Sequence, residues 1–335
     1  MNSNKMLFYF ILFFSTMITI SSNSWLGCWM GLEINLLSFI PIISYSNNIL
    51  ASESSLKYFL IQSIASMNFL FSIILNMIYF KYLEFNFYMS IMINSSLFMK
   101  LGSAPFHFWF PNIIEGLSWF NNLILMTWQK ITPMILLSYY YNYYFLILSM
   151  ILSTMFGALG GLNQSSLRKL FSFSSINHLG WMLAALLISE NLLIFYFLIY
   201  FLMMSLMCIL FNNLNLYFTH QLFLINLNNS IKIFILFNFL SLGGLPPFLG
   251  FFPKWIVINF LIQNNLFLMM FIFISMSLII LFFYIRIMYS SFLMNYFKIK
   301  WFNFFIKNKF QNLIMYFSYY SLFSLTFSTY IFYFF

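Results

Sequence analysis

Ionisable side chains are rare in this sequence, and several of them lie within long apolar segments. Glu33, Lys100, Lys130, His178 and Lys254 all fall within such segments. A charged group at the centre of a lipid bilayer costs about 2.5–3.5 kcal/mol on insertion scales, so such groups are kept mainly where they carry ions or protons. These five residues therefore predict proton movement through a hydrocarbon layer.

Glu33 and Lys100 have opposite charges and could interact. Burial favours the neutral form of a lysine, whereas a nearby carboxylate favours its charged form. A Glu33–Lys100 pair that opens and closes would therefore switch the proton affinity of the lysine. The alternative is a permanent buried ion pair that fixes helix packing, and the sequence leaves both interpretations open.

The other candidates are two lysines and a histidine. Lys130 has no acidic residue in its own apolar segment, which favours a role as proton carrier. Lys254 follows a helix break, and the alternative for it is a side chain that reaches the membrane surface. An imidazole exchanges protons near neutral pH, so His178 could relay them, although hydrogen-bonded packing explains it equally well. We expect His107 to cap carbonyls at a break and His220 to lie in a solvated loop.

The composition identifies an integral membrane protein. Of 335 residues, 63% are hydrophobic and only 6% are charged, and the mean hydropathy is +0.93. Soluble domains have about 25% charged residues. The apolar stretches lack the strict alternation of membrane β-barrels, so we expect an all-α protein without a soluble domain.

Several classes of chemistry are excluded. Cys28 and Cys208 have no CxxC spacing, so no iron–sulfur ligand set or disulfide framework is expected. The phosphate-binding patterns GxGxxG and GxxxxGK[ST] are absent. The net charge of +9 does not predict nucleic-acid binding, because no basic cluster lies on a hydrophilic surface. We expect neither a cofactor nor a metal in this chain.

The residue usage indicates an AT-rich genome, as found in organelles. There are 50 Phe, 23 Met and 22 Tyr, but a single Val and no Asp. No Arg-rich transit peptide precedes the first apolar segment, so we expect synthesis inside the organelle.

The apolar segments predict eleven transmembrane helices with short connections. They lie at 6–21, 25–45, 56–78, 88–110, 116–140, 143–162, 167–188, 191–213, 231–260, 265–290 and 311–335. With the N-terminus inside, Lys81 alone flanks an outer loop. The basic residues that flank inner loops are Lys5, Lys57, Arg168, Lys169, Lys232, Arg286, Lys298, Lys300, Lys307 and Lys309. This asymmetry predicts an N-terminus on the matrix side and a C-terminus in the intermembrane space, if the organelle is a mitochondrion.

Two of these spans contain similar interruptions. Both have Pro-Phe, two further residues, an aromatic residue and Phe-Pro, and both have glycine upstream. Because proline removes a hydrogen-bond donor and clashes with the preceding turn, each span should break there. The break residues are Gly102, Pro105 and Pro111 in the first span, and Gly243, Gly244, Pro246, Pro247 and Pro253 in the second.

The two breaks are five spans apart, so their helices should run in opposite directions. Matching broken helices in opposed halves are typical of inverted-repeat transporters. We therefore predict a first inverted repeat at 1–140, a second at 141–290, and a matrix loop with a final helix at 291–335.

Short motifs throughout the chain resemble the family of mitochondrial NADH–ubiquinone oxidoreductase chain 2, in a form that looks like an insect version. The segments that carry the resemblance are Trp29-Met30-Gly31-Leu32-Glu33, Met99-Lys100-Leu101-Gly102, Ala104-Pro105-Phe106-His107-Phe108-Trp109, Thr127-Trp128-Gln129-Lys130, Gly160-Gly161-Leu162-Asn163-Gln164, Arg168-Lys169, Ser174-Ser175-Ile176 with His178, Leu242-Gly243-Gly244-Leu245-Pro246-Pro247, and Pro253-Lys254-Trp255.

The resemblance implies an antiporter-like core subunit in the membrane arm of respiratory complex I, in the mitochondrial inner membrane. It implies a Glu33–Lys100 pair, a central Lys130, a relay His178 and a terminal Lys254, all on a proton path. Flavin, iron–sulfur clusters and quinone would belong to partner subunits. The implied partners are the other membrane-arm subunits and membrane lipids such as cardiolipin.

Two other functions stay open on the sequence alone. The chain could be a structural membrane module that joins neighbouring pumps, in which case the charges form packing pairs. It could also be a free-standing cation/proton antiporter of the same fold. The absence of Asp, a common sodium ligand, argues against the second alternative.

Overall fold

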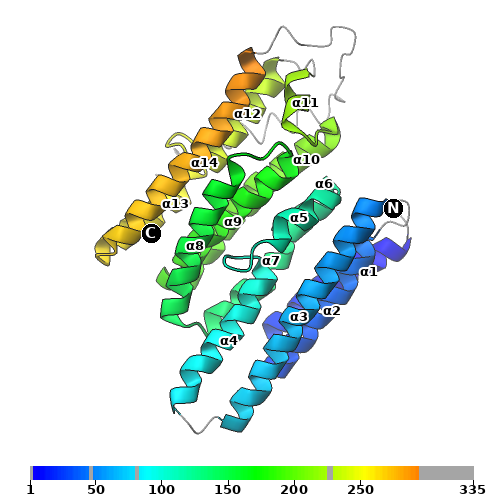
Figure 1. Cartoon of the computed structure of the whole chain (residues 1–335), viewed down its shortest axis with the longest axis vertical. Helices are drawn as coiled ribbons and strands as arrows, with labels where there is room; N and C mark the ends of the chain where they lie inside the picture. The colour runs from blue at the N-terminus through cyan, green and yellow to red at the C-terminus, as the bar shows by residue number, and fades with distance from the viewer. Residues whose placement is uncertain (1–2, 45–47, 80–82, 225–228, 294–335) are drawn as a thin grey trace. The chain divides into compact units, whose positions relative to one another are not determined.

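The computed structural model describes residues 3–44, 48–79, 83–224 and 229–293, and these segments are helical with short connections (Figure 1). The β-structure found in them is one isolated bridge between Ser166 and Phe218. The chain divides into two compact units, residues 1–152 and 153–335, and the boundary falls within helix α8 (Tyr143–Gly161). The predicted span 311–335 lies outside the described residues.

The first unit is a bundle in which long helices surround shorter, interrupted ones. Helix α1 packs against α2, α2 against α3, α3 against both α4 and α5, and α4 against α7. The bounds are α1 Ser3–Ser21, α2 Trp25–Ile43, α3 Ile49–Tyr79, α4 Leu83–Leu101, α5 Trp109–Gly116, α6 Trp119–Met126 and α7 Trp128–Tyr139.

The second unit is built around α9, which is largely buried along its length. Helix α9 packs against α10 and α13, and α12 packs against α10 and α14. This burial places the polar residues of α9, His178 among them, inside the protein. The bounds are α9 Leu167–Ile188, α10 Glu190–Leu214, α11 Thr219–Leu224, α12 Asn229–Gly243, α13 Phe251–Gln263 and α14 Phe267–Leu293.

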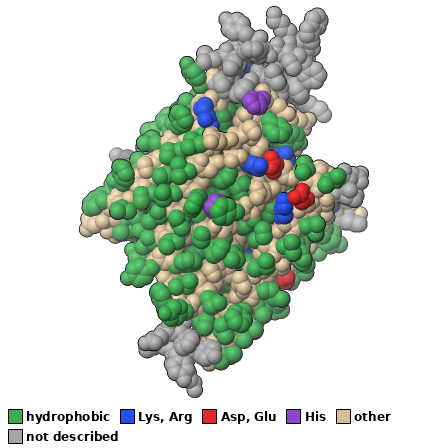
Figure 2. All heavy atoms as spheres, in the orientation of Figure 1, with side chains coloured by type: hydrophobic (Ala, Val, Ile, Leu, Met, Phe, Trp, Pro, Cys, Tyr) green, Lys and Arg blue, Asp and Glu red, His purple; other side chains and the backbone are tan. Residues whose placement is uncertain are grey.

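Each predicted span that falls within the described residues contains helix, but the bounds differ, and α5 and α11 lie mostly between predicted spans. By length and hydropathy, six of the described helices are able to cross a membrane: Trp25–Ile43, Ile49–Ile78, Tyr143–Gly161, Leu167–Ile188, Glu190–Leu214 and Phe267–Tyr289. The remaining predicted spans consist of shorter, interrupted or less apolar helices. Figure 2 shows hydrophobic side chains spread over the face in view, with only scattered charged ones. The membrane-protein class is thus supported, whereas the number of eleven spans stays a prediction.

One interruption was not predicted. The apolar pattern predicts one span at 116–140, but α6 ends at Met126 and α7 begins at Trp128. The Thr127 hydroxyl donates a hydrogen bond to the Leu123 carbonyl at 2.6 Å, and the amide of Lys130 donates to the Thr127 carbonyl, three residues back. A threonine hydroxyl that competes for a helix carbonyl in this way bends the helix.

The two predicted breaks are present, and they have the same local hydrogen-bond pattern. Gly102 and Gly244 end α4 and α12 in the left-handed conformation, with φ of 70° and 81°. Each glycine amide bonds to the carbonyl four residues earlier, and the next amide bonds to that same carbonyl. This is a glycine-terminated helix end, in which a side chain at the glycine would be strained.

Candidate functional site

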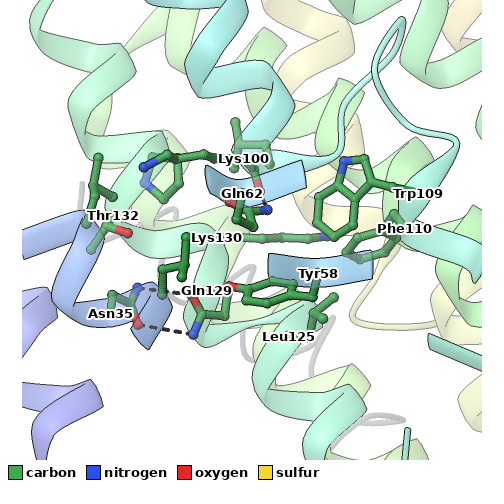
Figure 3. A pocket seen from close by; sticks show the side chains of 14 residues that line it. Asn35, Tyr58, Gln62, Lys100, Trp109, Phe110, Leu125, Gln129, Lys130 and Thr132 are labelled. Carbon is green, nitrogen blue, oxygen red and sulfur yellow. Dashed lines mark hydrogen bonds between the residues drawn. The ribbon is translucent and has the colours of Figure 1, made fainter. Parts of the chain in front are cut away.

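Two of the predicted lysines share a small cavity in the first unit. Lys100 lies in the last turn of α4 and Lys130 in the first turn of α7, and both line the cavity beside Tyr58, Gln62 and Gln129 (Figure 3). Its volume is about 20 Å³, enough for one or two water molecules. The breaks that end α4 and begin α7 bring the two lysines to the same place.

Lys130 is the most deeply buried of these lysines, with 1% of its surface exposed. Its ammonium nitrogen lies 5.3 Å from the centre of the Phe110 ring, a distance at which the ring face attracts a cation. The Thr132 hydroxyl lines the same cavity and is buried without a hydrogen-bond partner among the described residues. A water molecule in the cavity would satisfy this hydroxyl and link it to the lysines.

A pair of amide side chains fixes the start of α7 against α2. Asn35 donates to Gln129 at 3.0 Å, and Gln129 donates back to Asn35 at 3.1 Å (Figure 3). Gln129 directly precedes Lys130, and Asn35 lies two residues after Glu33 on α2. The pair therefore sets the position of Lys130 relative to the helix that carries Glu33.

Glu33 interacts with Lys100 electrostatically but does not form an ion pair with it. No nitrogen–oxygen distance between these two described residues falls within 4.0 Å. One carboxylate oxygen of Glu33 is buried and has no hydrogen-bond partner among the described residues. The permanent ion pair left open by the sequence is therefore absent in this conformation, and the carboxylate can move without breaking a direct contact to Lys100.

The second unit places His178 in a buried polar contact. Its Nδ1 atom lies 2.9 Å from the Tyr196 hydroxyl, which comes from the neighbouring helix α10. Both residues line a cavity of about 10 Å³ together with Tyr200, Ser241 and Leu242, a space that holds about one water molecule. The imidazole is thus held in one orientation beside a site for a water molecule.

Lys254 turns back onto the break between α12 and α13. Its ammonium donates to the Gly243 carbonyl at 3.0 Å and to the Leu242 carbonyl at 3.4 Å. These carbonyls end α12 and have no partner within the helix, and the partial negative charge there favours a cation. The ammonium also lies 5.8 Å from the centre of the Trp181 ring. In this structure Lys254 therefore contacts the break, as opposed to the membrane surface.

The predicted residues form one group in each unit. Glu33, Lys100 and Lys130 are neighbours in the first unit, and the cavity beside His178 is lined by Leu242, whose carbonyl binds Lys254. His107 is buried at the first break, with its ring 4.3 Å from that of Phe108. No group of three His, Cys, Asp or Glu residues suited to a metal occurs in the part of the chain that the structure describes.

Some residues at these sites had no assigned role from the sequence. Asn35 and Tyr196 were not identified, because asparagine is common here and Tyr196 is one of 22 tyrosines. The proline three residues after Lys130 marks an irregular segment, but nothing in the sequence pairs Gln129 with Asn35.

Long apolar helices, helices broken in their middle and lysines buried at the breaks define a class of protein: polytopic membrane proteins that hold ionisable groups within the hydrocarbon layer. The sequence also matches a family model described as NADH:quinone oxidoreductase/Mrp antiporter, transmembrane, over residues 22–280.

Curated relatives specify the family further. NADH-ubiquinone oxidoreductase chain 2 of Anopheles gambiae is 53% identical over 310 residues, which cover 91% of this chain and 90% of the relative. The protein of the same name from Locusta migratoria is 46% identical over 296 residues, covering 88% and 86%. The chain belongs to the NADH-ubiquinone oxidoreductase chain 2 family, within the NADH:quinone oxidoreductase/Mrp antiporter group.

Solved structures share the fold. A chain of respiratory complex I from Thermus thermophilus superimposes with a TM-score of 0.75 at 22% identity, covering 87% of this chain and 71% of that one. A chain of the Mrp complex from Dietzia gives a TM-score of 0.74 at 13% identity, covering 84% and 58%. At 22% and 13% identity, this likeness shows a shared fold and nothing more.

Proposed function

We propose that this chain is a core membrane-arm subunit of proton-pumping NADH:ubiquinone oxidoreductase in the mitochondrial inner membrane. It moves protons through a chain of buried Glu, Lys and His residues and water. Membership of the chain 2 family supports the enzyme complex. The observation that carries the proton step is the small cavity that the buried Lys100 and Lys130 share.

In the first unit, the proposed step is a proton transfer from Lys100 to Lys130 through water in their cavity. Displacement of Glu33 toward or away from Lys100 changes how strongly the lysine holds its proton, because a nearby carboxylate stabilises the ammonium form. Moving one charge against 100 mV costs about 2.3 kcal/mol, or less than two units of pKa at about 1.36 kcal/mol per unit. A modest movement of Glu33 is therefore sufficient to drive the step.

In the second unit, the proposed carriers are His178 and Lys254. Tyr196 orients the imidazole, and one water molecule in the adjoining cavity extends the path toward the break at Leu242. The carbonyls of Leu242 and Gly243 stabilise the ammonium form of Lys254. When Lys254 loses its proton, these contacts weaken and the side chain would leave the break. We place Lys130 before His178, and Lys254 last, in the order of transfer.

We further propose eleven transmembrane helices, with the N-terminus in the matrix and the C-terminus in the intermembrane space. The distribution of lysine and arginine supports this orientation. We also propose inverted repeats at 1–140 and 141–290, followed by a matrix loop and a last helix at 291–335. The same hydrogen-bond pattern at Gly102 and Gly244 supports the repeat relationship.

Electron transfer is assigned to partner subunits in this proposal. Because the sequence has no cluster-binding or flavin motif, we place flavin, iron–sulfur clusters and quinone in other chains. The proposed partners are the neighbouring membrane-arm subunits, together with inner-membrane lipids such as cardiolipin. Conformational or electrostatic changes would reach Glu33 and the lysines through these lateral contacts.

Membership of the complex is tested by gentle solubilisation of the source membranes, a native gel stained for NADH oxidation, and mass spectrometry of the bands. We expect the chain in the large NADH-oxidising band. If it instead migrates alone as a small species, the proposed complex is wrong and a free-standing antiporter becomes the better explanation.

A further inference from the structure

An apolar groove of about 570 Å³ lies on the first unit, outside the lysine cavity. Three segments border it: the first half of α3, the break after α4, and α5. Phe108 and Ile64 are strongly exposed in it. The lining residues are Lys57, Ile61, Ile64, Met99, Pro105, Phe106, Phe108, Trp109 and Asn112.

The groove has a polar end and an apolar end, because α5 runs antiparallel to α3. The end of α5 at Gly116 adjoins the start of α3 at Leu50, and the beginning of α5 at Trp109 lies beside Tyr58. Lys57 and Asn112 are therefore at the same end of the groove. Ile61, Ile64, Met99 and Phe106 continue from there as an apolar surface.

The depth of the polar end in a membrane follows from the length of α3. Its 31 residues span about 46 Å at 1.5 Å per residue. The hydrocarbon core is about 30 Å thick, and the bilayer with its headgroups is about 40–45 Å thick. Because α3 is longer than the core is thick, its first residues extend beyond the core. The predicted span 56–78 leaves Glu53 outside the core and Lys57 at its boundary, from where a lysine side chain reaches the headgroups.

Glu53 does not line the groove itself, but as the partner of Lys57 it adds a negative charge beside this end. Lys57 and Glu53 form an ion pair at 2.6 Å, and the two side chains are 48% and 54% exposed. A purely anionic headgroup would meet the Glu53 carboxylate. A headgroup with a phosphate and a primary ammonium would instead place its phosphate at Lys57 and Asn112 and donate its ammonium hydrogens to Glu53.

We infer that this groove binds one phospholipid with a primary-amine headgroup, of the phosphatidylethanolamine type, with an acyl chain along Ile61, Ile64, Met99 and Phe106. A choline headgroup has no N–H to donate to Glu53, and cardiolipin has no cation for it. The inference is independent of the proposed proton path, because none of these residues lines the lysine cavity except Trp109.

The test uses lipids with a light-activated diazirine in the acyl chain, added to the intact complex in native membranes. Three analogues with the same chains carry ethanolamine, choline or cardiolipin headgroups, and labelled peptides are located by mass spectrometry. We expect the ethanolamine lipid to label the groove about two- to fivefold more than the others, the range for exposed charge pairs. The exposed residues Phe271 and Leu278 on α14 provide the control and should be labelled without headgroup preference.

The variant Glu53→Gln should abolish the preference for ethanolamine over cardiolipin and leave acyl-chain labelling of the groove in place. Equal labelling of the groove by all three lipids in the unmodified chain would mean bulk lipid and overturn the inference. A preference for cardiolipin would also overturn it. Labelling on α14 with none in the groove would show that a partner helix covers this surface, and the inference would again be wrong.

Discussion

Substitution of Gly244 by alanine should displace the ammonium of Lys254. Gly244 has a φ of 81°, and a β-carbon there would lie 2.9 Å from the ammonium nitrogen of Lys254 and 3.0 Å from its δ-carbon. The neighbouring Gly243 is helical, and a β-carbon there meets nothing closer than 3.6 Å. Gly243→Ala is therefore a matched control one residue away, expected to change little.

The free-energy cost of Gly244→Ala has two parts, one from the backbone and one from the lost contact of Lys254. A residue with a side chain in the left-handed conformation costs about 1–2 kcal/mol. A hydrogen bond to a charged group contributes about 1.5–3 kcal/mol, and water does not replace it here because Lys254 is only 3% exposed. The lost hydrogen bond weakens only the protonated form of Lys254. Gly244→Ala should therefore lower the ratio of protonated to neutral Lys254 by about ten- to a hundredfold, at about 1.36 kcal/mol per factor of ten.

The assay compares NADH oxidation and proton uptake in proteoliposomes, at equal amounts of assembled complex. We expect Gly244→Ala to lower proton uptake per NADH, and Gly243→Ala to leave it near the unmodified value. In a Lys254→Met background, Gly244→Ala should have no further effect on proton uptake, since there is no ammonium to displace. An effect of Gly244→Ala that is equal with and without the lysine would show that the alanine does not act through Lys254.

Two further predictions concern the polar contacts around the lysines and the histidine. Tyr196→Phe removes the hydrogen bond to His178 and should slow proton transfer by about two- to tenfold, the equivalent of about 0.5–1.5 kcal/mol. Stopped-flow measurement of proton uptake gives this rate. An equal loss in the control Tyr144→Phe, at an exposed tyrosine, would contradict the prediction. Asn35→Leu leaves the Gln129 amide unpaired and should lower the stability of the assembled complex by about 1–3 kcal/mol. The double variant Asn35→Leu/Gln129→Leu should recover part of this loss. Stability is measured as the loss of the native-gel band on heating, and losses that simply add in the double variant would contradict the pairing.

The break segments show what the sequence was able to predict. Glycine and proline have specific backbone effects, so the interruptions near Gly102 and Gly244 followed directly from residue type and position. The membrane class followed in the same way, because 6% charged residues cannot solvate a surface in water. These features depend on local chemistry or on composition, both of which a single sequence contains.

Side-chain partners from distant segments could not be predicted. The pairing of Asn35 with Gln129 joins residues 94 positions apart, and the contact of Lys254 with Gly243 depends on how α13 folds back on α12. The interruption at Thr127 was missed for a related reason. A threonine that bonds to the carbonyl of Leu123 looks like any other threonine in an apolar segment.

The proposed proton path runs through Lys130, and the variant Lys130→Met tests whether this lysine carries protons. Methionine retains the length and apolar body of the side chain but removes the charge. The measurement is the number of protons transported per electron by the assembled complex in proteoliposomes. We expect a lower ratio than in the unmodified complex, or NADH oxidation uncoupled from transport. An unchanged ratio with full assembly would contradict it and favour a structural role for the buried lysines.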